Sequence, residues 1–162
     1  SIEADLDSHS DHEGNHLGEQ RQAWEQVANI FQAFKSFEYA EGRSLFDLTT
    51  FMVVSEFSRT PYLNGARGKD HNPHANSVLL AGKNINGGNA TGSSQIISRS
   101  ESRYGRSEHI GAAINYKSGE IIESQENRNK DVSLIFPENI AATIRKAFGS
   151  TENDALPFVV KS

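Results

Sequence analysis

Apolar residues recur at a helical spacing early in the chain, where Trp24, Val27, Phe31 and Phe34 lie at i, i+3, i+7 and i+10. Polar residues fill most of the positions between them. The pattern therefore predicts an amphipathic helix over about 19–40, with the apolar stripe packed into a core. A glycine two residues later is a typical stop for such a helix.

A second helix is predicted from Pro137 to Phe148. Proline suits the first turn of a helix, because the amide hydrogen that it lacks would have no partner there. Gly149 suits the end, since glycine readily adopts the left-handed conformation common after a helix.

Two short runs, 49–55 and 77–81, are apolar and β-branched without alternation. Such runs are typical of strands buried on both faces, as in a parallel sheet. Residues 2–6 alternate between apolar and acidic side chains, as in a further strand. The sequence of 110–122 predicts a hairpin that turns at 117–119. Helices mixed with buried strands indicate an α/β fold, with 1–162 forming a single domain or a domain fragment.

Residues 84–107 are rich in glycine, serine and asparagine, which predicts an irregular surface excursion. The strand-like alternation starts almost at the first residue, Ser1, so we expect a fragment or processed product that begins inside a fold.

Composition narrows the classes of function. The net charge of −5 and the pI of about 5.7 offer no electrostatic footprint for nucleic acid or an anionic membrane. The absence of cysteine excludes disulfides, zinc–thiolate sites and cysteine nucleophiles. No apolar run is long enough to span a membrane.

Carboxylates and imidazoles gather directly after the first predicted strand, in the run Asp7-Ser8-His9-Ser10-Asp11-His12. Anionic oxygen and neutral nitrogen suit a divalent cation such as zinc. Loops at the ends of strands are also where open α/β sheets bind ligands. Asp7 and His9 are the first candidates, with Asp11 and His12 as further candidate ligands. The alternative is a solvated acidic segment whose histidines face water.

Two later elements have the same chemistry. Glu56 follows a predicted buried strand, where a carboxylate is costly to bury unless it is paired or coordinates a metal. Its alternative partner is Arg59 or Lys69. Asp70 and His71 form the third element, in a loop that precedes the next strand. We therefore expect three metal-type elements to meet at one edge of a sheet.

The same segments resemble the motifs of a bacterial domain-of-unknown-function family numbered 1501, in family order and over nearly the whole chain. That family is similar to the alkaline phosphatase and sulfatase superfamily. The similar segments are Asp7-Ser8-His9 (family D-T-H), 51–61 (FMVVSEFSRTP, family V-V-x-x-E-F-G-R-T-P), 68–73 (GKDHNP, family G-R-D-H-W-P), 77–82 (SVLLAG) and 137–144 (PENIAATI, family P-E-D-x-A-A-T-I). Ser58, Lys69 and Asn72 depart from the pattern. Asn72 replaces a tryptophan, which changes a pocket wall.

The resemblance implies a metal-dependent site. Enzymes of that superfamily hold two zinc ions with Asp and His at strand ends. By this resemblance Asp7 and His9 hold one ion, and His71 completes the set of ligands around that ion. Glu56 sits where the superfamily presents an Asp-His pair, and Phe57 in the place of the histidine weakens the second metal position.

The resemblance also implies a fold and a location. The chain is expected to be the C-terminal part of an alkaline-phosphatase-like three-layer α/β/α sandwich with a mostly parallel sheet. Relatives with twin-arginine export signals imply a periplasmic or extracellular protein. The superfamily's nucleophile comes from an early strand, so no catalytic residue is assigned in this chain.

Two functions follow from the resemblance. The first is the metal-binding portion of an exported phosphatase- or sulfatase-like hydrolase, inactive alone and acting on a small anionic ester. The alternative is a non-catalytic exported binding or structural protein that retains the fold. In either case we expect the sheet to be covered by the protein's own N-terminal part or by a second copy.

Overall fold

The computed structural model describes residues 7–11, 14–98, 100, 108–122 and 132–161. In chain order its elements are α1 (His16–Ser36), β1 (Glu38–Ala40), β2 (Arg43–Ser44), the short 3-10 helix η1 (Leu45–Leu48), β3 (Thr50–Val54), β4 (Ser58–Arg59), β5 (His71–Asn72), β6 (Val78–Gly82), β7 (Ser94–Ile97), β8 (Glu108–Gly111), β9 (Ile114–Asn115), β10 (Val132–Ser133) and α2 (Pro137–Ala147). The strands of this part of the chain pair into small antiparallel sheets, so the fold is mixed α/β.

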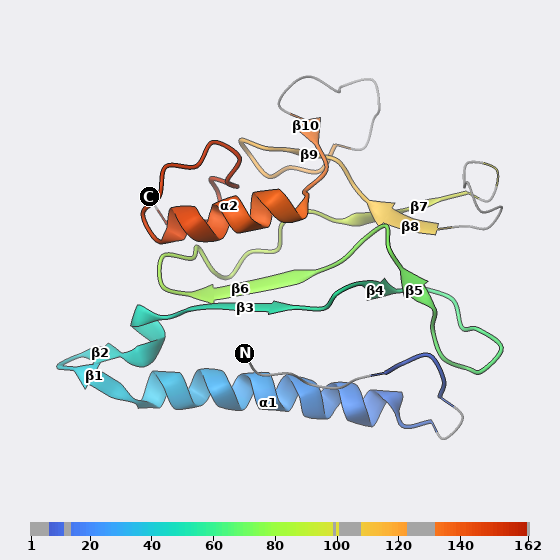
Figure 1. The fold of residues 1–162 in the computed structure, drawn as a ribbon, viewed down its shortest axis with the longest axis horizontal. Coiled ribbons are helices and arrows are strands. Elements are labelled where there is room, and N and C mark those ends of the chain that lie inside the picture. The colour runs from blue at the N-terminus through green and yellow to red at the C-terminus, as the bar shows by residue number, and fades with distance from the viewer. Residues whose placement is uncertain (1–6, 12–13, 99, 101–107, 123–131, 162) are drawn as a thin grey trace.

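Residues 50–82 form one long antiparallel hairpin, drawn in cyan and green in Figure 1. β3 pairs with β6 from Thr50↔Gly82 to Val54↔Val78. Further out, β4 pairs with β5. The tip of the hairpin closes at a hydrogen bond of 2.8 Å from the amide of Asn64 to the carbonyl of Gly68. This tip, residues 60–70, positions the candidate site.

The antiparallel pairing corrects the expected parallel arrangement of the two apolar runs. Neither strand is buried on both faces: Met52 and Val54 are each 51% exposed, whereas Phe51 and Val53 are half-buried. An uninterrupted apolar run predicts burial on both sides, but the period-2 pleat still separates an inner face from an outer one. The described residues show no mostly parallel, three-layer sheet.

Aromatic packing fixes α1 against the hairpin. The ring of Phe51 lies 4.9 Å from those of Phe31 and Phe34 and 5.3 Å from that of Phe46, measured between centroids. The helical spacing of Phe31 and Phe34 thus predicts the packed face correctly. Trp24 is 56% exposed, however, so the expectation that it lies in the core is wrong.

The predicted first helix exists but is displaced. It begins at His16 and ends at Ser36, because residues 38–40 turn away into β1. None of its residues is fully buried. Its packing against the hairpin therefore rests on half-buried side chains, chiefly Phe31 and Phe34.

A second core forms around α2, which ends one residue before the predicted Phe148. Ala142 and Ala147 of the helix are buried, as are Ile114 and Leu156 from neighbouring segments. Thr143 is completely buried, and its hydroxyl donates to Asn139 O (2.6 Å) and accepts from Leu156 N (2.9 Å). Those bonds satisfy the polar groups in this small core.

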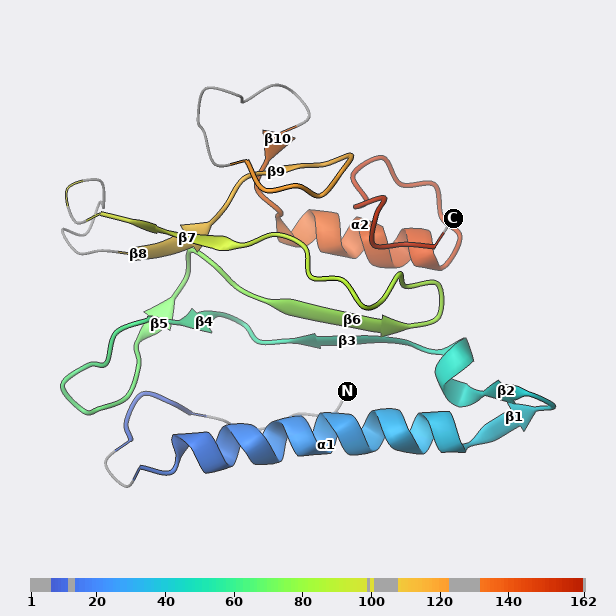
Figure 2. The ribbon, with the colours of Figure 1, turned by 180° about the vertical axis from the view of Figure 1, so that it is seen from behind.

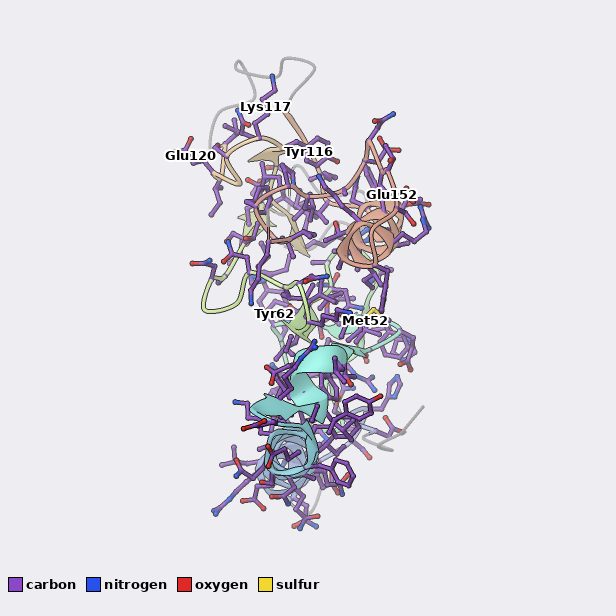
Figure 3. All side chains as sticks on the ribbon, turned by 90° about the vertical axis from the view of Figure 1, so that its left-hand side faces the viewer. Met52, Tyr62, Tyr116, Lys117, Glu120 and Glu152 are labelled. Atoms are coloured by element: carbon purple, nitrogen blue, oxygen red, sulfur yellow. The ribbon has the colours of Figure 1, made fainter. Side chains whose placement is uncertain are left out.

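The predicted hairpin in 110–122 is confirmed, since Ile114 bridges to Ile121 and the amide of Asn115 bonds to the carbonyl of Glu120. Figure 3 shows this turn at the end of the molecule, marked by Lys117 and Glu120. The expected irregular excursion over 84–107 is partly wrong, because it contains strand β7, paired with β8. Residues 99 and 101–107 of that range lie outside the described residues.

The β3–β6 pair lies between α1 and α2 in both Figure 1 and Figure 2. Much apolar surface stays exposed, including Met52, which is labelled near the middle of the molecule in Figure 3. Exposed large apolar side chains of the described residues include Leu17, Trp24, Phe37, Tyr39, Met52, Val54, Tyr62, Leu63, Ile96, Leu134, Phe136 and Phe148. No helix in the described ranges is both long and apolar enough to cross a membrane.

Candidate functional site

The side chain of Asn64 organises the hairpin tip. Its Oδ1 accepts hydrogen bonds from the amides of Ala66 (2.9 Å) and Gly68 (3.1 Å). Its Nδ2 donates to the carbonyl of His9 (2.8 Å) and to Oδ1 of Asp70 (3.0 Å). The amide group thereby uses two acceptor and two donor positions at once. One side chain therefore shapes the tip and holds the segment that carries His9.

Residues 7–11 lie along the tip as an extended segment. The amide of Lys69 donates to Ser8 O (2.7 Å), and the amide of Asp11 donates to Ala66 O (3.1 Å). Gly68 faces the backbone of His9 so closely that a Cβ at that position would overlap the His9 carbonyl. A glycine is needed here for close backbone approach.

Docking of this segment brings Asp7, His9 and Arg59 together. His9 Nδ1 lies 2.7 Å from Asp7 Oδ1, and the His9 amide donates to the same oxygen at 3.0 Å. Arg59 Nη2 donates to Asp7 Oδ1 at 3.3 Å, and its Nη1 lies 3.2 Å from His9 Nδ1. A carboxylate only accepts and a guanidinium only donates, so the two contacts at Nδ1 favour opposite tautomers. The shorter contact, with Asp7, places the hydrogen on Nδ1 and leaves the lone pair on Nε2. Arg59 Nη1 then makes no hydrogen bond to this ring.

These contacts also set the charge of Asp7. The hydrogen bond from the His9 amide, followed by that from the His9 ring, holds the pKa of the Asp7 carboxyl below its usual value of 3.8. The Coulombic effects of His9 and Arg59 act in the same direction. A lowered folded-state pKa means that the contacts are present above pH 3.8 and are lost as the pH falls through the lowered value.

His71 comes from β5 and completes the cluster. Its ring stacks on that of Phe57, with centroids 3.6 Å apart and planes at 24°. It also contacts the ring of His9, with centroids 4.4 Å apart and planes at 51°. The expected convergence of Asp7, His9 and His71 is therefore present, across more than sixty residues of sequence. Arg59 lies over the Phe57 ring at 5.0 Å.

The other predicted site residues do not join this cluster. Glu56 is exposed and shows no ion pair with Arg59 or Lys69, so the expectation of an inward-facing carboxylate is wrong. Asp70 is half-buried and bonds to Asn64. Asp11 faces His16, with Oδ2 at 3.6 Å from Nδ1. His12 lies outside the described residues.

A metal ion fits this arrangement only in part. Two imidazoles meet, and the carboxylate of Asp7 is turned toward His9 Nδ1, the usual position for a carboxylate that orients a metal-binding histidine. Within the described ranges, no three His, Asp or Glu side chains are placed to hold one ion together. The cluster can thus supply imidazole nitrogens, while its remaining positions would fall to water or to a ligand.

Sequence reasoning missed Arg59 as part of the cluster and Asn64 entirely. The Asn-Gly pair at 64–65 is a turn signal that marks the tip of the hairpin. Nothing in the sequence, however, shows that the same amide also holds residues 7–11. The sequence indicates Arg59 only as a partner for Glu56.

A family model described as "Protein of unknown function (DUF1501)" matches residues 3–118 of the chain. The match covers the docked segment, the whole hairpin and strand β8. No curated protein and no solved structure matches the chain.

The geometry at Gly68 predicts the effect of one methyl group. Gly68→Ala should expel residues 7–11 from the tip, because the new Cβ overlaps the His9 backbone. The amides of Lys69 and Asp11, which bond across this contact, should then exchange with deuterium at least tenfold faster. Gly65→Ala is the matched control, since a Cβ there meets nothing within 4 Å. Equal protection in both variants would contradict the docked arrangement.

Proposed function

The chain belongs to the DUF1501 family, and from the cluster at the hairpin tip we propose that it carries the metal- and anion-binding part of a phosphatase- or sulfatase-like hydrolase. The observation that supports this proposal is the meeting of His9 and His71, at 4.4 Å between ring centroids, beside Asp7 and Arg59. These are residue types that hold a divalent cation and an oxyanion together.

Each side chain has a distinct role in this proposal. His9 presents Nε2 to the ion, and Asp7 orients that ring through Nδ1. His71 supplies a second imidazole, held in place by its stacking on Phe57. Arg59 has one face on Phe57 and is 21% exposed, so its guanidinium is fixed where it can bind an ester oxygen.

The ion, when bound, would supply a Lewis acid that neutralises charge on the ester oxygens and acidifies a bound water. Zinc is the ion that best suits imidazole ligands with open positions. We assign no attacking group among the described residues, so the chain by itself is not proposed to turn over. By family resemblance, we also propose that it works in the periplasm or outside the cell.

One observation favours a second candidate function. Phe57 stacks on the face of His71, so an aromatic ring occupies the region where a second metal ligand would be expected from superfamily resemblance. Arg59 meanwhile places a fixed positive charge against Asp7. A protein that binds a single ion or an anion without catalysis fits these two contacts. Binding of zinc without hydrolysis of phosphate and sulfate esters, measured with the protein's own N-terminal part present, would select this second function.

Zinc titration by calorimetry tests the ion site. The chain should bind one zinc ion, and His9→Gln or His71→Gln should each weaken binding at least tenfold. Asp7→Asn should weaken it roughly 10–100-fold by removing the orienting carboxylate.

Two matched controls accompany these variants. Glu56→Gln changes an exposed carboxylate outside the cluster, and His16→Gln changes a histidine that faces Asp11. Both should keep the affinity of the unmodified chain. If the chain binds no zinc, or if the controls weaken binding as much as His9→Gln does, the ion site is wrong.

We further propose that a second polypeptide surface, such as the protein's own N-terminal part or a second copy, covers the exposed apolar face. Many large apolar side chains of the described residues, from α1 to the end of α2, are more than a third exposed. Exposed apolar surface of this kind marks contacts with another polypeptide. Met52 and Val54 point outward from β3 and are natural centres for such a contact.

Light scattering after size exclusion tests this covering with a second copy. The isolated chain should elute as a dimer, at twice 17.8 kDa. Replacing both Met52 and Val54 by Asp should shift it toward monomer, because charge is costly to bury in an apolar contact. Lys117→Glu, in the turn that Figure 3 shows far from Met52, serves as the control for a charge change elsewhere. A monodisperse monomer of the unmodified chain would contradict self-association.

A further inference from the structure

A cavity of about 400 Å³ opens beside the candidate site, and His71 belongs to both. Its walls come from the hairpin tip (60–63), from residues 70–74 that follow it, and from the start of β8. The volume lies within the range of small-molecule pockets, roughly 300–1,000 Å³. Of the residues in the candidate site, Asp7, His9 and Arg59 do not line this cavity, so the proposed ion site does not account for it.

The wall chemistry indicates a neutral ligand group. Pro61, Tyr62, Leu63 and Pro73 contribute apolar side chains to the lining, and none of the described residues that line the cavity is Lys or Arg. Two carboxylates, Asp70 and Glu108, also line the cavity, and they would repel an anion. Carboxylates and imidazoles do accept hydrogen bonds from hydroxyl groups.

The cavity is also built in a fixed shape. Asn72, only 5% exposed, donates from Nδ2 to His109 O (3.2 Å) and accepts at Oδ1 from the amide of His74 (3.1 Å). The amide of Gly111 bonds in turn to His74 O at 3.1 Å. These bonds tie the loop after β5 to strand β8, so the two walls keep their spacing. A preformed pocket costs less ordering free energy when a ligand binds.

The exposure of two side chains agrees with a binding role. Tyr62 is 47% and Leu63 67% exposed, although both are large and apolar. They lie in the lining of the cavity, where an apolar ring face could cover them. Burial of such a ring would contribute about 25 cal/mol per Å² of apolar area removed from water.

We propose that this cavity binds a neutral hydroxylated ring, with its apolar face on Tyr62 and Leu63 and its hydroxyl edge toward Asp70, Glu108 and His109. A phenol and a pyranose sugar share this chemistry. In the intact ligand the ring would be the uncharged part of an ester whose anionic group lies across His71, at Arg59. That last step rests on the proposed function, whereas binding of the ring alone does not.

Amide and imidazole NMR shifts of the chain, titrated with phenol and separately with methyl glucopyranoside, test this proposal. At least one probe should shift the resonances of Tyr62, His71 and His109 in a saturable way. Tyr62→Ala should weaken that binding at least fivefold. Tyr39→Ala removes a tyrosine that is 66% exposed in β1, far along the chain from the cavity, and should leave the binding unchanged.

The outcomes separate the two proposals. Ring binding that Tyr62→Ala weakens, with unchanged zinc affinity in that variant, supports the cavity assignment. Ring binding in a chain that binds no zinc also supports the cavity and counts only against the metal site. Absence of saturable shifts with either probe, or equal binding by Tyr62→Ala and the unmodified chain, overturns the assignment. The probe that binds more tightly identifies the ring as aromatic or as a sugar.

Discussion

The four hydrogen bonds of the Asn64 side chain are the constraint on which the candidate site depends. Two of them close the hairpin tip onto itself, and the other two reach His9 O and Asp70 Oδ1. An aspartate could not replace this residue, because its oxygens would face a carbonyl and a carboxylate where the amide now donates. The tip and the docked segment are thus held by one group that must be an amide in this orientation.

From that attachment the chemistry of the site follows in order. Once residues 7–11 lie on the tip, the His9 ring reaches His71 and the Asp7 carboxylate reaches Arg59. Phe57 supports both neighbours, with His71 stacked on it and Arg59 over its ring. Arg59 and His71 are register partners in the β4–β5 pair, so backbone pairing keeps their spacing. Phe57 lies directly before β4. His9 and Asp7 depend instead on a short extended segment, which makes their position the more sensitive part of the site.

Much of this arrangement could be predicted from the sequence, for identifiable reasons. The spacing of Phe31 and Phe34 gives the packed face of α1, and the proline and glycine at 137 and 149 bracket α2. The proximity of Asp7, His9 and His71 was expected from strand ends and from family resemblance. It arises differently, through a hairpin tip rather than the edge of a parallel sheet.

The errors have physical causes as well. The stretches 51–54 and 78–81 contain no polar residue to mark an outer face, so their half-exposed antiparallel pairing leaves no trace in the pattern. Glu56 lies two residues beyond Val54, itself two beyond Met52, and all three are exposed. The cavity and the role of Asn72 depend on contacts between β5 and β8, which no local pattern encodes.

The candidate site exists only if docking of residues 7–11 places the His9 ring against the His71 ring. Nuclear Overhauser effects between the ring protons of the histidines and phenylalanines measure this contact most directly. We expect cross-peaks from His71 to both Phe57 and His9; a cross-peak to Phe57 without one to His9 would show that the hairpin is right and the docked site is not.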